Sequence, residues 1–298
     1  MNNGANILHS KLKENKIVKV AGAFDAMSAK LVEFSGFDAV WAGSFAISAT
    51  HALPDASILT MTDFLHVSAN MVESCKIPII ADCDTGYGGP SNVSHMVKKY
   101  ERAGISAVSI EDKIFPKQNS LLEEGKQDLL PEKDFVAKLI AAKEAKESDD
   151  FMIIARIEAL IAKQGLTEAI KRADAYEKAG ADAILIHSRQ KTPDEIFQFC
   201  DLYKGELPII AIPTSYPDVT LQELQQHKIK MVIYANQTLR VAHLAMKNLL
   251  SEIYAKDNMA NISMGMSSME EIFELQKMYD IKNQEKEIEE NLKKLGYV

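Results

Sequence analysis

Three carboxylates stand where short apolar runs of the sequence end. Asp82 and Asp84 lie two residues apart directly after one run, and Glu111 follows the next run along the chain. Such runs are typical of buried parallel strands, and in a β/α barrel the carboxyl ends of the strands share one rim. Carboxylates gathered there repel one another unless a cation lies among them. An all-oxygen set favours Mg2+, with Mn2+ as the alternative, over zinc, and bound waters are expected to complete an octahedron.

Each of these acids has a structural interpretation when taken alone. Asp84 could cap the turn that follows it, and Glu111 or Asp112 could pair with a lysine. We favour a metal site only for the three carboxylates together. Cys83 is not counted as a ligand, because strand alternation directs its side chain to the face opposite its aspartate neighbours.

Three cationic or imidazole side chains come from other units of the chain, namely Lys117, Arg156 and His187. We expect them to form one small positive corner opposite the acids, which would suit a substrate that carries both carboxylate and phosphoryl groups. Arginine grips phosphoryl oxygens with its planar fork, lysine supplies a point charge and histidine a directional donor. The alternatives are a buried structural histidine and a salt bridge that closes the barrel.

The stretch 111–131 is polar and much longer than the ~2 to 6 residues of an ordinary connection from strand to helix. Its side chains Lys117, Asn119 and Ser120 are hydrogen-bond donors at the rim where the acids are expected. A long loop at this rim predicts a lid that closes over the site and excludes water. An ordinary surface excursion is the alternative.

Eight short apolar runs, many of them β-branched, alternate with helical stretches and are expected to hold these side chains. A closed (β/α)8 barrel is therefore the predicted architecture, with an open doubly wound sheet as the alternative. No G-x-G-x-x-G follows any of the runs, which weakens that alternative. Three helix-to-strand returns share one pattern, with Gly36, Gly104 and Gly180 as helix C-caps. The predicted strands are 17–21, 38–41, 77–81, 107–110, 152–155, 183–186, 208–212 and 231–234.

The pattern changes after Tyr234. We expect a helix over 237–254, a Met, Ser and Asn-rich linker over 258–268, and one charged tail helix that begins at Met269. The predicted organisation is one catalytic barrel, residues 1–257, followed by a linker and helical tail, residues 258–298. The tail is more typical of a solvated or partner-packing helix than of a catalytic one.

Composition excludes several classes of function. The 298 residues are 47% hydrophobic and carry a formal net charge of -8, without a dense run of lysine and arginine, so no nucleic-acid partner is expected. No segment approaches the ~18 consecutive apolar residues of a membrane helix, so we expect no membrane association. The three cysteines are odd in number and free of any Cys-x-x-Cys pattern, which suits the reducing cytoplasm.

Longer motifs carry a family resemblance from about residue 17 to the helix after Tyr234. The segments AGAFDAMSAKLVEFSGFDAVW and D-x-D-T-G-Y-G resemble signatures of the isocitrate lyase and phosphoenolpyruvate mutase superfamily of barrels. EDKIFPKQNS is more specific, since it matches E-D-K-x-x-x-K-x-N-S of the phosphoenolpyruvate mutases at every fixed position. The resemblance implies a Mg2+-dependent isomerase of phosphonate biosynthesis, which interconverts phosphoenolpyruvate and 3-phosphonopyruvate.

The resemblance also implies a role for each site residue. Asp82 would hold Mg2+, with Asp84 and Glu111 acting partly through metal-bound waters. The migrating phosphoryl group would be bound by Arg156, His187 and Asn119, supported from the lid by Lys117 and Ser120. Asp55 would lie next to the reaction centre, either as nucleophile or only fixing geometry. The loop of Trp41, Gly43, Ser44 and Phe45 would hold the pyruvate oxygens, through the Ser44 hydroxyl or through the backbone amides alone.

Several rivals share the superfamily. A phosphonopyruvate hydrolase would direct water at phosphorus, and such hydrolases tend to carry Thr where this chain has Asn119. Carbon–carbon lyases carry a cysteine in a K-[KR]-C-G-H lid, which is absent here, whereas an oxaloacetate decarboxylase is harder to exclude. A non-catalytic barrel that binds a phosphorylated ligand is the remote alternative. The family further suggests a homodimer or homotetramer, with C-terminal helices swapped between protomers.

Overall fold

The computed structural model describes residues 3–256, 262 and 265–297. The chain divides into two compact units, Met1–Val241 and Ala242–Val298, which are considered separately below. The first unit contains every strand and nearly all of the buried side chains. It is therefore the unit that can enclose a site.

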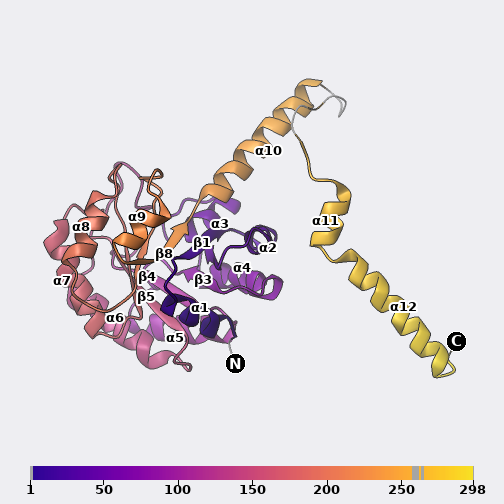
Figure 1. Ribbon diagram of the computed structural model, residues 1–298, viewed down its shortest axis with the longest axis horizontal. Helices are drawn as coiled ribbons and strands as arrows, with labels where there is room; N and C mark the ends of the chain where they lie inside the picture. Colours follow the sequence, from indigo (N-terminus) through magenta and orange to yellow (C-terminus); the bar gives the residue numbers. More distant parts are fainter. Residues whose placement is uncertain (1–2, 257–261, 263–264, 298) are drawn as a thin grey trace. The chain divides into compact units, whose positions relative to one another are not determined.

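Eight parallel strands of the first unit close into a barrel in the order β1 to β8, with each strand paired to its neighbours in sequence and β8 paired to β1. Figure 1 labels β1, β3, β4, β5 and β8 among the helices of this unit. The predicted (β/α)8 architecture is confirmed, and each predicted strand overlaps an observed one. The strands are β1 Val18–Ala23, β2 Ala39–Ala42, β3 Ile79–Asp82, β4 Ala107–Glu111, β5 Met152–Ile157, β6 Ala183–Ile186, β7 Ile209–Ala211 and β8 Ile229–Tyr234.

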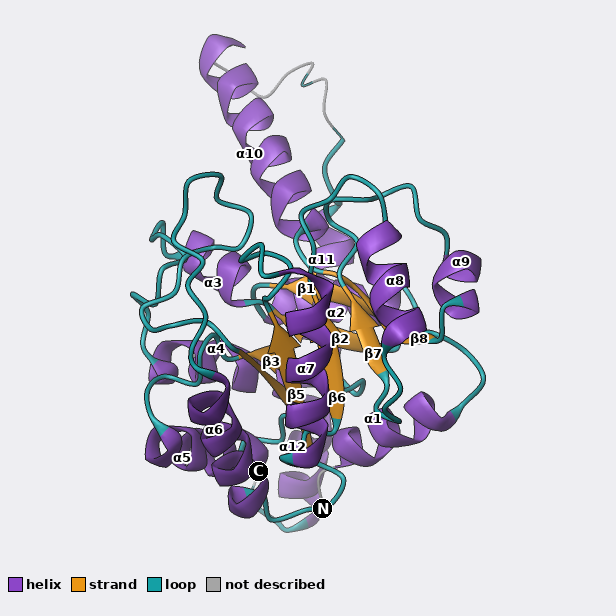
Figure 2. Cartoon of the chain, turned by 90° about the vertical axis from the view of Figure 1, so that its left-hand side faces the viewer, coloured by secondary structure: helices purple, strands orange, loops and turns teal. Residues whose placement is uncertain are grey.

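Helices of the first unit surround the strands as an outer layer (Figure 2). Several begin with a side-chain cap, as in α4, where Thr60 accepts a hydrogen bond from the Asp63 amide. The helices are α1 Asn3–Lys13, α2 Ala26–Phe34, α3 Ser44–Thr50, α4 Met61–Ser74, α5 Pro90–Arg102, α6 Glu132–Ala145, α7 Gly165–Lys178, α8 Asp194–Leu202 and α9 Leu221–Gln226.

Strand alternation divides the apolar side chains into two layers. Along β2, Ala39 and Trp41 belong to the cluster inside the barrel, whereas Val40 and Ala42 belong to the cluster between strands and helices. Leu8 of α1 lies in the inner cluster together with residues from the starts of the strands. Because α1 closes the N-terminal end of the barrel, the C-terminal end is left open for a site.

The three glycines predicted as C-caps do end their helices, but each lies one position beyond the C-cap residue. Gly36, Gly104 and Gly180 have φ values of +79°, +86° and +93°, a left-handed conformation that glycine adopts without the steric cost of a Cβ atom. Each comes directly after the C-cap residue of an outer-layer helix and turns the chain into the next strand; the C-cap residues are Ser35, Ala103 and Ala179. The repeated phrase in the sequence therefore corresponds to a repeated turn of the backbone.

The second unit is helical in its described part. Helix α10 Gln237–Lys256 starts in the first unit and continues into the second, and it is followed by α11 Met269–Leu275 and α12 Met278–Lys294. The prediction of one continuous tail helix was wrong, because Lys277 adopts a left-handed conformation with φ of 55° and separates α11 from α12. Most of the predicted linker 258–268, and the predicted boundary after residue 257, lie outside the described residues.

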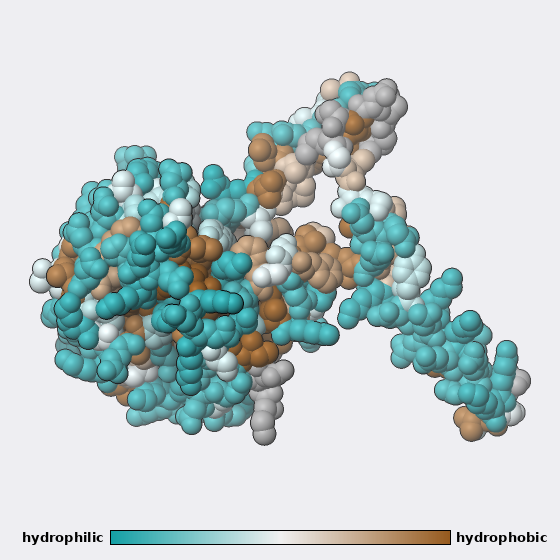
Figure 3. All heavy atoms as spheres, in the orientation of Figure 1, coloured by the Kyte–Doolittle hydropathy of each residue, from teal (hydrophilic) through white to brown (hydrophobic). Residues whose placement is uncertain are grey.

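None of the three helices α10, α11 and α12 contains a buried residue among those described. Hydrophobic side chains are exposed on α10, whereas α12 is hydrophilic over most of its visible face (Figure 3). Throughout the described residues, no helix has both the length and the apolar character that crossing a membrane requires.

Candidate active site

A cavity of about 260 Å³ opens at the C-terminal ends of the strands, and most of the predicted site residues line it. This is the rim where β/α barrels place their chemistry. Of the predicted set, Asp84 and Glu111 are not in the cavity wall and lie behind it, 3% and 2% exposed. The predicted residues in the wall are Trp41, Gly43, Ser44, Phe45, Asp55, Asp82, Lys117, Asn119, Ser120, Arg156 and His187.

The loop after β3 carries the two aspartates on an unusual backbone. Asp84 has φ of 49° and Gly86 has φ of 84°, so the chain coils left-handed directly after the strand. A Cβ atom at Gly86 would lie 2.6 Å from Val93 Cγ2 of α5, so only glycine allows this close approach. Cys83 between the aspartates is fully buried in the cluster that faces the helices, as alternation predicted.

Ser44, at the start of α3, donates a hydrogen bond from its hydroxyl to Asp82 Oδ2 at 3.0 Å. The hydroxyl is therefore already used by an acid of the site. The amides of Ser44 and Phe45 stand in the first turn of the helix, where backbone N–H groups have no intrahelical partner. Of the two predicted ways in which this loop could bind pyruvate oxygens, the geometry favours the amides.

Burial raises the pKa of Asp84 to about 7; Lys117 opposes the shift, and the nearby carboxylates of Asp82, Asp55 and Glu111 add to it. The raised pKa belongs to Asp84 alone, and repulsion from the neighbouring acids contributes to it after burial. A bound cation would relieve this repulsion. Lys117 supplies one positive charge to this cluster, and a divalent ion would add to it.

The acids fit a divalent ion that is partly coordinated through water. The buried oxygens Glu111 Oε1 and Asp84 Oδ1 accept no hydrogen bond within the described residues. Each has only an ion pair, Glu111 Oε1 with Lys113 at 3.9 Å and Asp84 Oδ1 with Lys117 at 3.2 Å. Buried carboxylate oxygens without a hydrogen bond are costly, and a hydrated cation would satisfy them. In the described part of the chain, no three Asp, Glu, His or Cys side chains form a complete direct ligand set. Asp82 in the cavity wall and the deeper Asp84 and Glu111 thus offer oxygen atoms to a cation without forming a complete set of direct ligands.

The predicted positive corner does not form as a separate patch, because each cation is paired with acids. Lys117 Nζ lies 2.5 Å from Asp55 Oδ1 and 3.2 Å from Asp84 Oδ1. Although burial opposes it, the attraction of Asp84 and Asp55 raises the pKa of Lys117, so the ammonium stays charged. Cations and anions therefore alternate around the cavity, which lets both charges be buried.

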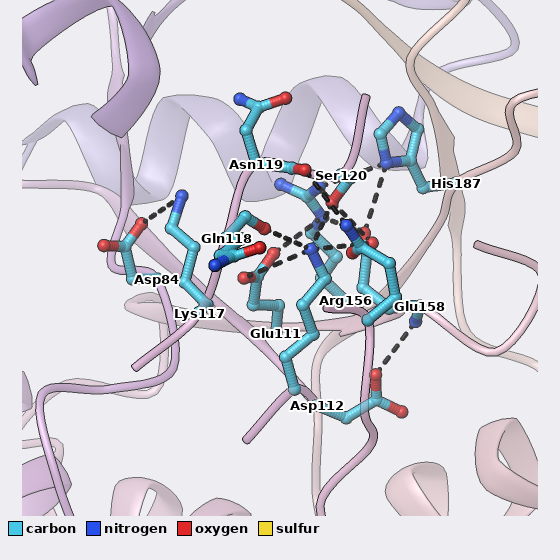
Figure 4. A network of polar contacts seen from close by, with 12 residues as sticks. Asp84, Glu111, Asp112, Lys117, Gln118, Asn119, Ser120, Arg156, Glu158 and His187 are labelled. Carbon is cyan, nitrogen blue, oxygen red and sulfur yellow. Dashed lines mark hydrogen bonds and ion pairs between the residues drawn. The ribbon is translucent and has the colours of Figure 1, made fainter. Parts of the chain in front are cut away.

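Arg156 is held in a second network beside the first (Figure 4). Its Nε donates to Glu158 Oε1 at 2.6 Å, and its Nη2 donates to Ser120 Oγ at 3.0 Å and faces His187 Nδ1 at 3.1 Å. Burial lowers the pKa of His187, against the opposing pull of Glu158, which keeps the imidazole neutral at physiological pH. A guanidinium and a neutral imidazole thus meet at the cavity wall, suited to an anionic group.

Glu158 is the main residue that the sequence reasoning did not identify. Glu158 is the first residue after β5 and lies two positions beyond Arg156, so strand alternation places the two side chains on the same face. That spacing was the available signal. The other wall residues were also unassigned. They come from α3, the lid, the segments after β7 and β8, and the first turn of α10; these are Ala46, Leu121, Ile212, Thr214, Ala235, Asn236 and Arg240.

The long loop after β4, residues 112–131, lies over the cavity as the predicted lid. An isolated antiparallel bridge between Lys113 and Leu129 joins its two ends. Its tip is tied to the loop after α3, since Asn119 Nδ2 donates to Asp55 Oδ2 at 2.7 Å and the Lys117 amide donates to Ser57 Oγ at 3.1 Å. The described conformation is therefore closed.

The base of the lid is anchored by a buried cluster on the outer side of the barrel. Asp112 is fully buried and accepts hydrogen bonds from Arg172 Nη1 at 3.0 Å and Tyr176 Oη at 2.7 Å, both on α7. Arg172 Nη2 also donates to the Leu130 carbonyl at the far end of the lid. Asp112 thus has a structural role with an arginine, rather than with the lysine considered as an alternative.

Comparisons with known proteins agree with this geometry. The family model described as phosphoenolpyruvate phosphomutase matches residues 8–254. Phosphonopyruvate hydrolase from Variovorax sp. (strain Pal2) is 42% identical over 90% of this chain and 93% of its own. The crystal structure of phosphoenolpyruvate phosphomutase from Streptomyces platensis subsp. rosaceus is 41% identical with a TM-score of 0.93, over 96% of this chain and 99% of that one. A crystal structure of phosphonopyruvate hydrolase in complex with oxalate and Mg++ is 39% identical with a TM-score of 0.88, over 94% and 97%. The chain therefore belongs to the phosphoenolpyruvate phosphomutase family, a family of enzymes.

Proposed function

We propose that this chain is a phosphoenolpyruvate mutase, an isomerase that moves a phosphoryl group between the enolate oxygen and the methylene carbon of one pyruvate skeleton. The observation that carries the proposal is the position of Asn119. From the closed lid it donates to Asp55 at 2.7 Å and lines the same cavity as Arg156 and His187. An amide donor there, rather than a site for an attacking water, favours transfer back to the pyruvate skeleton over hydrolysis.

Phosphoryl transfer requires that the substrate is positioned and that its charge is stabilised, and the residues of this site can do both. The amides of Ser44 and Phe45 would orient the pyruvate oxygens, while Arg156, His187 and Asn119 hold the migrating group. Asp55 is paired with Lys117 and Asn119 and would stand beside that group. The closed lid keeps water from capturing the phosphoryl group between its two acceptors.

Mg2+, or Mn2+ in its place, would be held by Asp82, with Asp84 and Glu111 behind it through bound waters. When bound, the ion supplies positive charge that stabilises the enolate. The buried Glu111 Oε1 that accepts no hydrogen bond in the described residues supports this placement. A phosphonopyruvate hydrolase is the second candidate, because a relative described as one is 42% identical over most of the chain.

Phosphorus NMR of the protein incubated with phosphonopyruvate and Mg2+ tests the proposal directly. A mutase produces phosphoenolpyruvate, and the same mixture is reached from either side. A hydrolase instead releases inorganic phosphate and pyruvate. Appearance of phosphate without phosphoenolpyruvate would replace the proposal by the second candidate, and no change in either compound would reject both.

Substitution of Asp82 by asparagine is expected to weaken Mg2+ binding by about 100-fold, because a charged ligand is replaced by a neutral one. Isothermal titration with Mg2+, or Mn2+ bound to the protein followed by electron paramagnetic resonance, measures the effect. Asp38→Asn is the matched control, since Asp38 pairs with Lys11 away from the cavity wall. Equal Mg2+ affinities of Asp82→Asn and Asp38→Asn would exclude Asp82 as a metal ligand.

The proposal includes a cytoplasmic homodimer or homotetramer. Val241, Leu244, Leu250 and Tyr254 are exposed on α10, and Tyr254 is 92% exposed. A helix with several uncovered apolar side chains is typical of a partner-binding helix, and exchange of such a helix between protomers would cover them. Sedimentation equilibrium compares the mass of the full chain with that of the double variant Leu244→Glu/Leu250→Glu, and we expect a smaller mass for the variant. An unchanged mass would exclude α10 from the interface.

A further inference from the structure

Glu158 binds two different parts of the site with its two oxygen atoms. Oε1 accepts from Arg156 Nε at 2.6 Å and lies 3.2 Å from His187 Nδ1. Oε2 accepts from Ser120 Oγ at 2.6 Å and lies 3.4 Å from Lys113 Nζ. One oxygen therefore faces the anion-binding side chains of the barrel, and the other faces the lid (Figure 4).

Glu158 is fully buried and is not part of the cavity wall. It cannot touch a ligand in the cavity and must act through its neighbours. Burial would raise the pKa of the carboxyl, but Arg156, Lys113 and His187 hold it well below its usual range. The side chain is thus a carboxylate that accepts hydrogen bonds at both oxygens.

Arg156 shows what this carboxylate contributes. Because its Nε is held by Glu158 and its Nη2 is directed at Ser120, the guanidinium plane has one orientation. In the described structure Arg156 Nη1 donates no hydrogen bond, so it stays available to an anion in the cavity. The Ser120 hydroxyl, which comes from the lid, bridges Arg156 and Glu158. Opening the lid would remove Ser120 from both partners at once.

We propose that Glu158 is a positioning residue that couples docking of the lid to the orientation of Arg156 and His187. The inference deepens the proposed function, on which it rests, by naming the group that completes the phosphoryl pocket only when the lid is closed. Lys113 strengthens the link, because its Nζ donates to Ser120 Oγ at 2.6 Å and to the Gln118 carbonyl at 2.9 Å. The Glu158 carboxylate therefore receives the Ser120 hydrogen bond only when the lid is closed.

A double-mutant cycle of Glu158→Gln and Ser120→Ala tests the coupling. Glutamine keeps the shape but lacks the charge and the second acceptor oxygen. We expect kcat/KM for phosphonopyruvate to fall about 100-fold in Glu158→Gln, as for a small misplacement of a catalytic group, with the loss mainly in kcat. Ser120→Ala should fall by less, and the double variant should be no worse than Glu158→Gln alone. Losses that multiply in the double variant would overturn the proposal.

Trypsin cleavage after Lys126, an exposed residue of the lid, gives a second readout that needs no turnover. With Mg2+ and oxalate present, we expect faster cleavage in Glu158→Gln and in Ser120→Ala than in the wild type. Oxalate is kept at a saturating concentration for each protein, so that a difference in cleavage reports the lid and not ligand occupancy. Glu177→Gln is the control, since Glu177 accepts hydrogen bonds from Tyr203 and Glu206 outside the cavity wall.

The outcomes separate this proposal from the proposed function. A wild type that fails to convert phosphonopyruvate rejects the function, while the cleavage rates still test the coupling. If Glu158→Gln does not fold, Ser120→Ala alone decides, because it removes the lid contact without leaving a buried charge unpaired. Ser120→Ala with wild-type kcat and wild-type cleavage would then exclude the coupling.

Discussion

Asn119→Ala is expected to abolish the interconversion of phosphoenolpyruvate and phosphonopyruvate while Mg2+ binding is unchanged. The amide of Asn119 donates to Asp55 Oδ2 at 2.7 Å and accepts from the Leu121 amide at 2.9 Å, so it is held on both sides. An amide group has two N–H donors, and the second is left for the migrating group. Alanine removes this donor and the tie between the lid and Asp55.

The measurement is turnover in both directions by phosphorus NMR, with Mg2+ affinity determined on the same preparation. Gln118→Ala is the matched control, because Gln118 is the adjacent lid amide and is not in the cavity wall. We expect the control to keep most of its activity. An Asn119→Ala variant with unchanged turnover would exclude Asn119 from the mechanism, and loss of Mg2+ binding would show that it supports the metal site instead.

Arg156→Lys is expected to lower kcat by about 1000-fold, close to the loss seen when a donor to a developing charge is removed. The guanidinium reaches Glu158, Ser120 and the cavity at once through a planar fork, and an ammonium cannot reproduce that geometry. Charge is conserved in the variant, so Glu158 keeps a cation nearby. Steady-state kinetics with phosphonopyruvate measure the effect.

Arg172→Lys is the control for the cost of altering a buried arginine. Arg172 is paired with Asp112 at 3.0 Å and supports the base of the lid without lining the cavity. We expect this variant to lose stability, seen as a lower Tm, with a much smaller loss of kcat below the melting transition. Equal losses of kcat in the two variants would mean that Arg156 acts through the fold and not through the substrate.

The barrel could be predicted because each strand is short, apolar and bounded by clear signals. Parallel strands buried on both faces read as continuous apolar runs, and Gly36, Gly104 and Gly180 mark where helices end. The break at Lys277 could not be predicted in this way. Lysine is a good helix former and no glycine or proline stands nearby, so the left-handed residue there is not encoded by local propensity.

The sequence was sufficient to predict which residues meet in the candidate site. It was not sufficient to predict how their charges pair. Strand ends identified Asp82 and Arg156 because that rim is shared by all eight strands. Their partners depend on side-chain direction across different units, which spacing does not give. The sequence therefore suggested that acids and cations face each other, whereas Lys117 lies between Asp55 and Asp84. Glu158 was overlooked because its role depends on a lid residue 38 positions away.

The fluorescence of Trp41 can report on the cavity. Trp41 is the single tryptophan of the chain, it is almost fully buried, and it lies in the cavity wall. Its indole emission therefore comes from one place, and changes in polarity or quenching there arise without background from other tryptophans. Ligand occupancy can be followed by fluorescence in the unlabelled protein and in every variant described above, since none of them alters this residue.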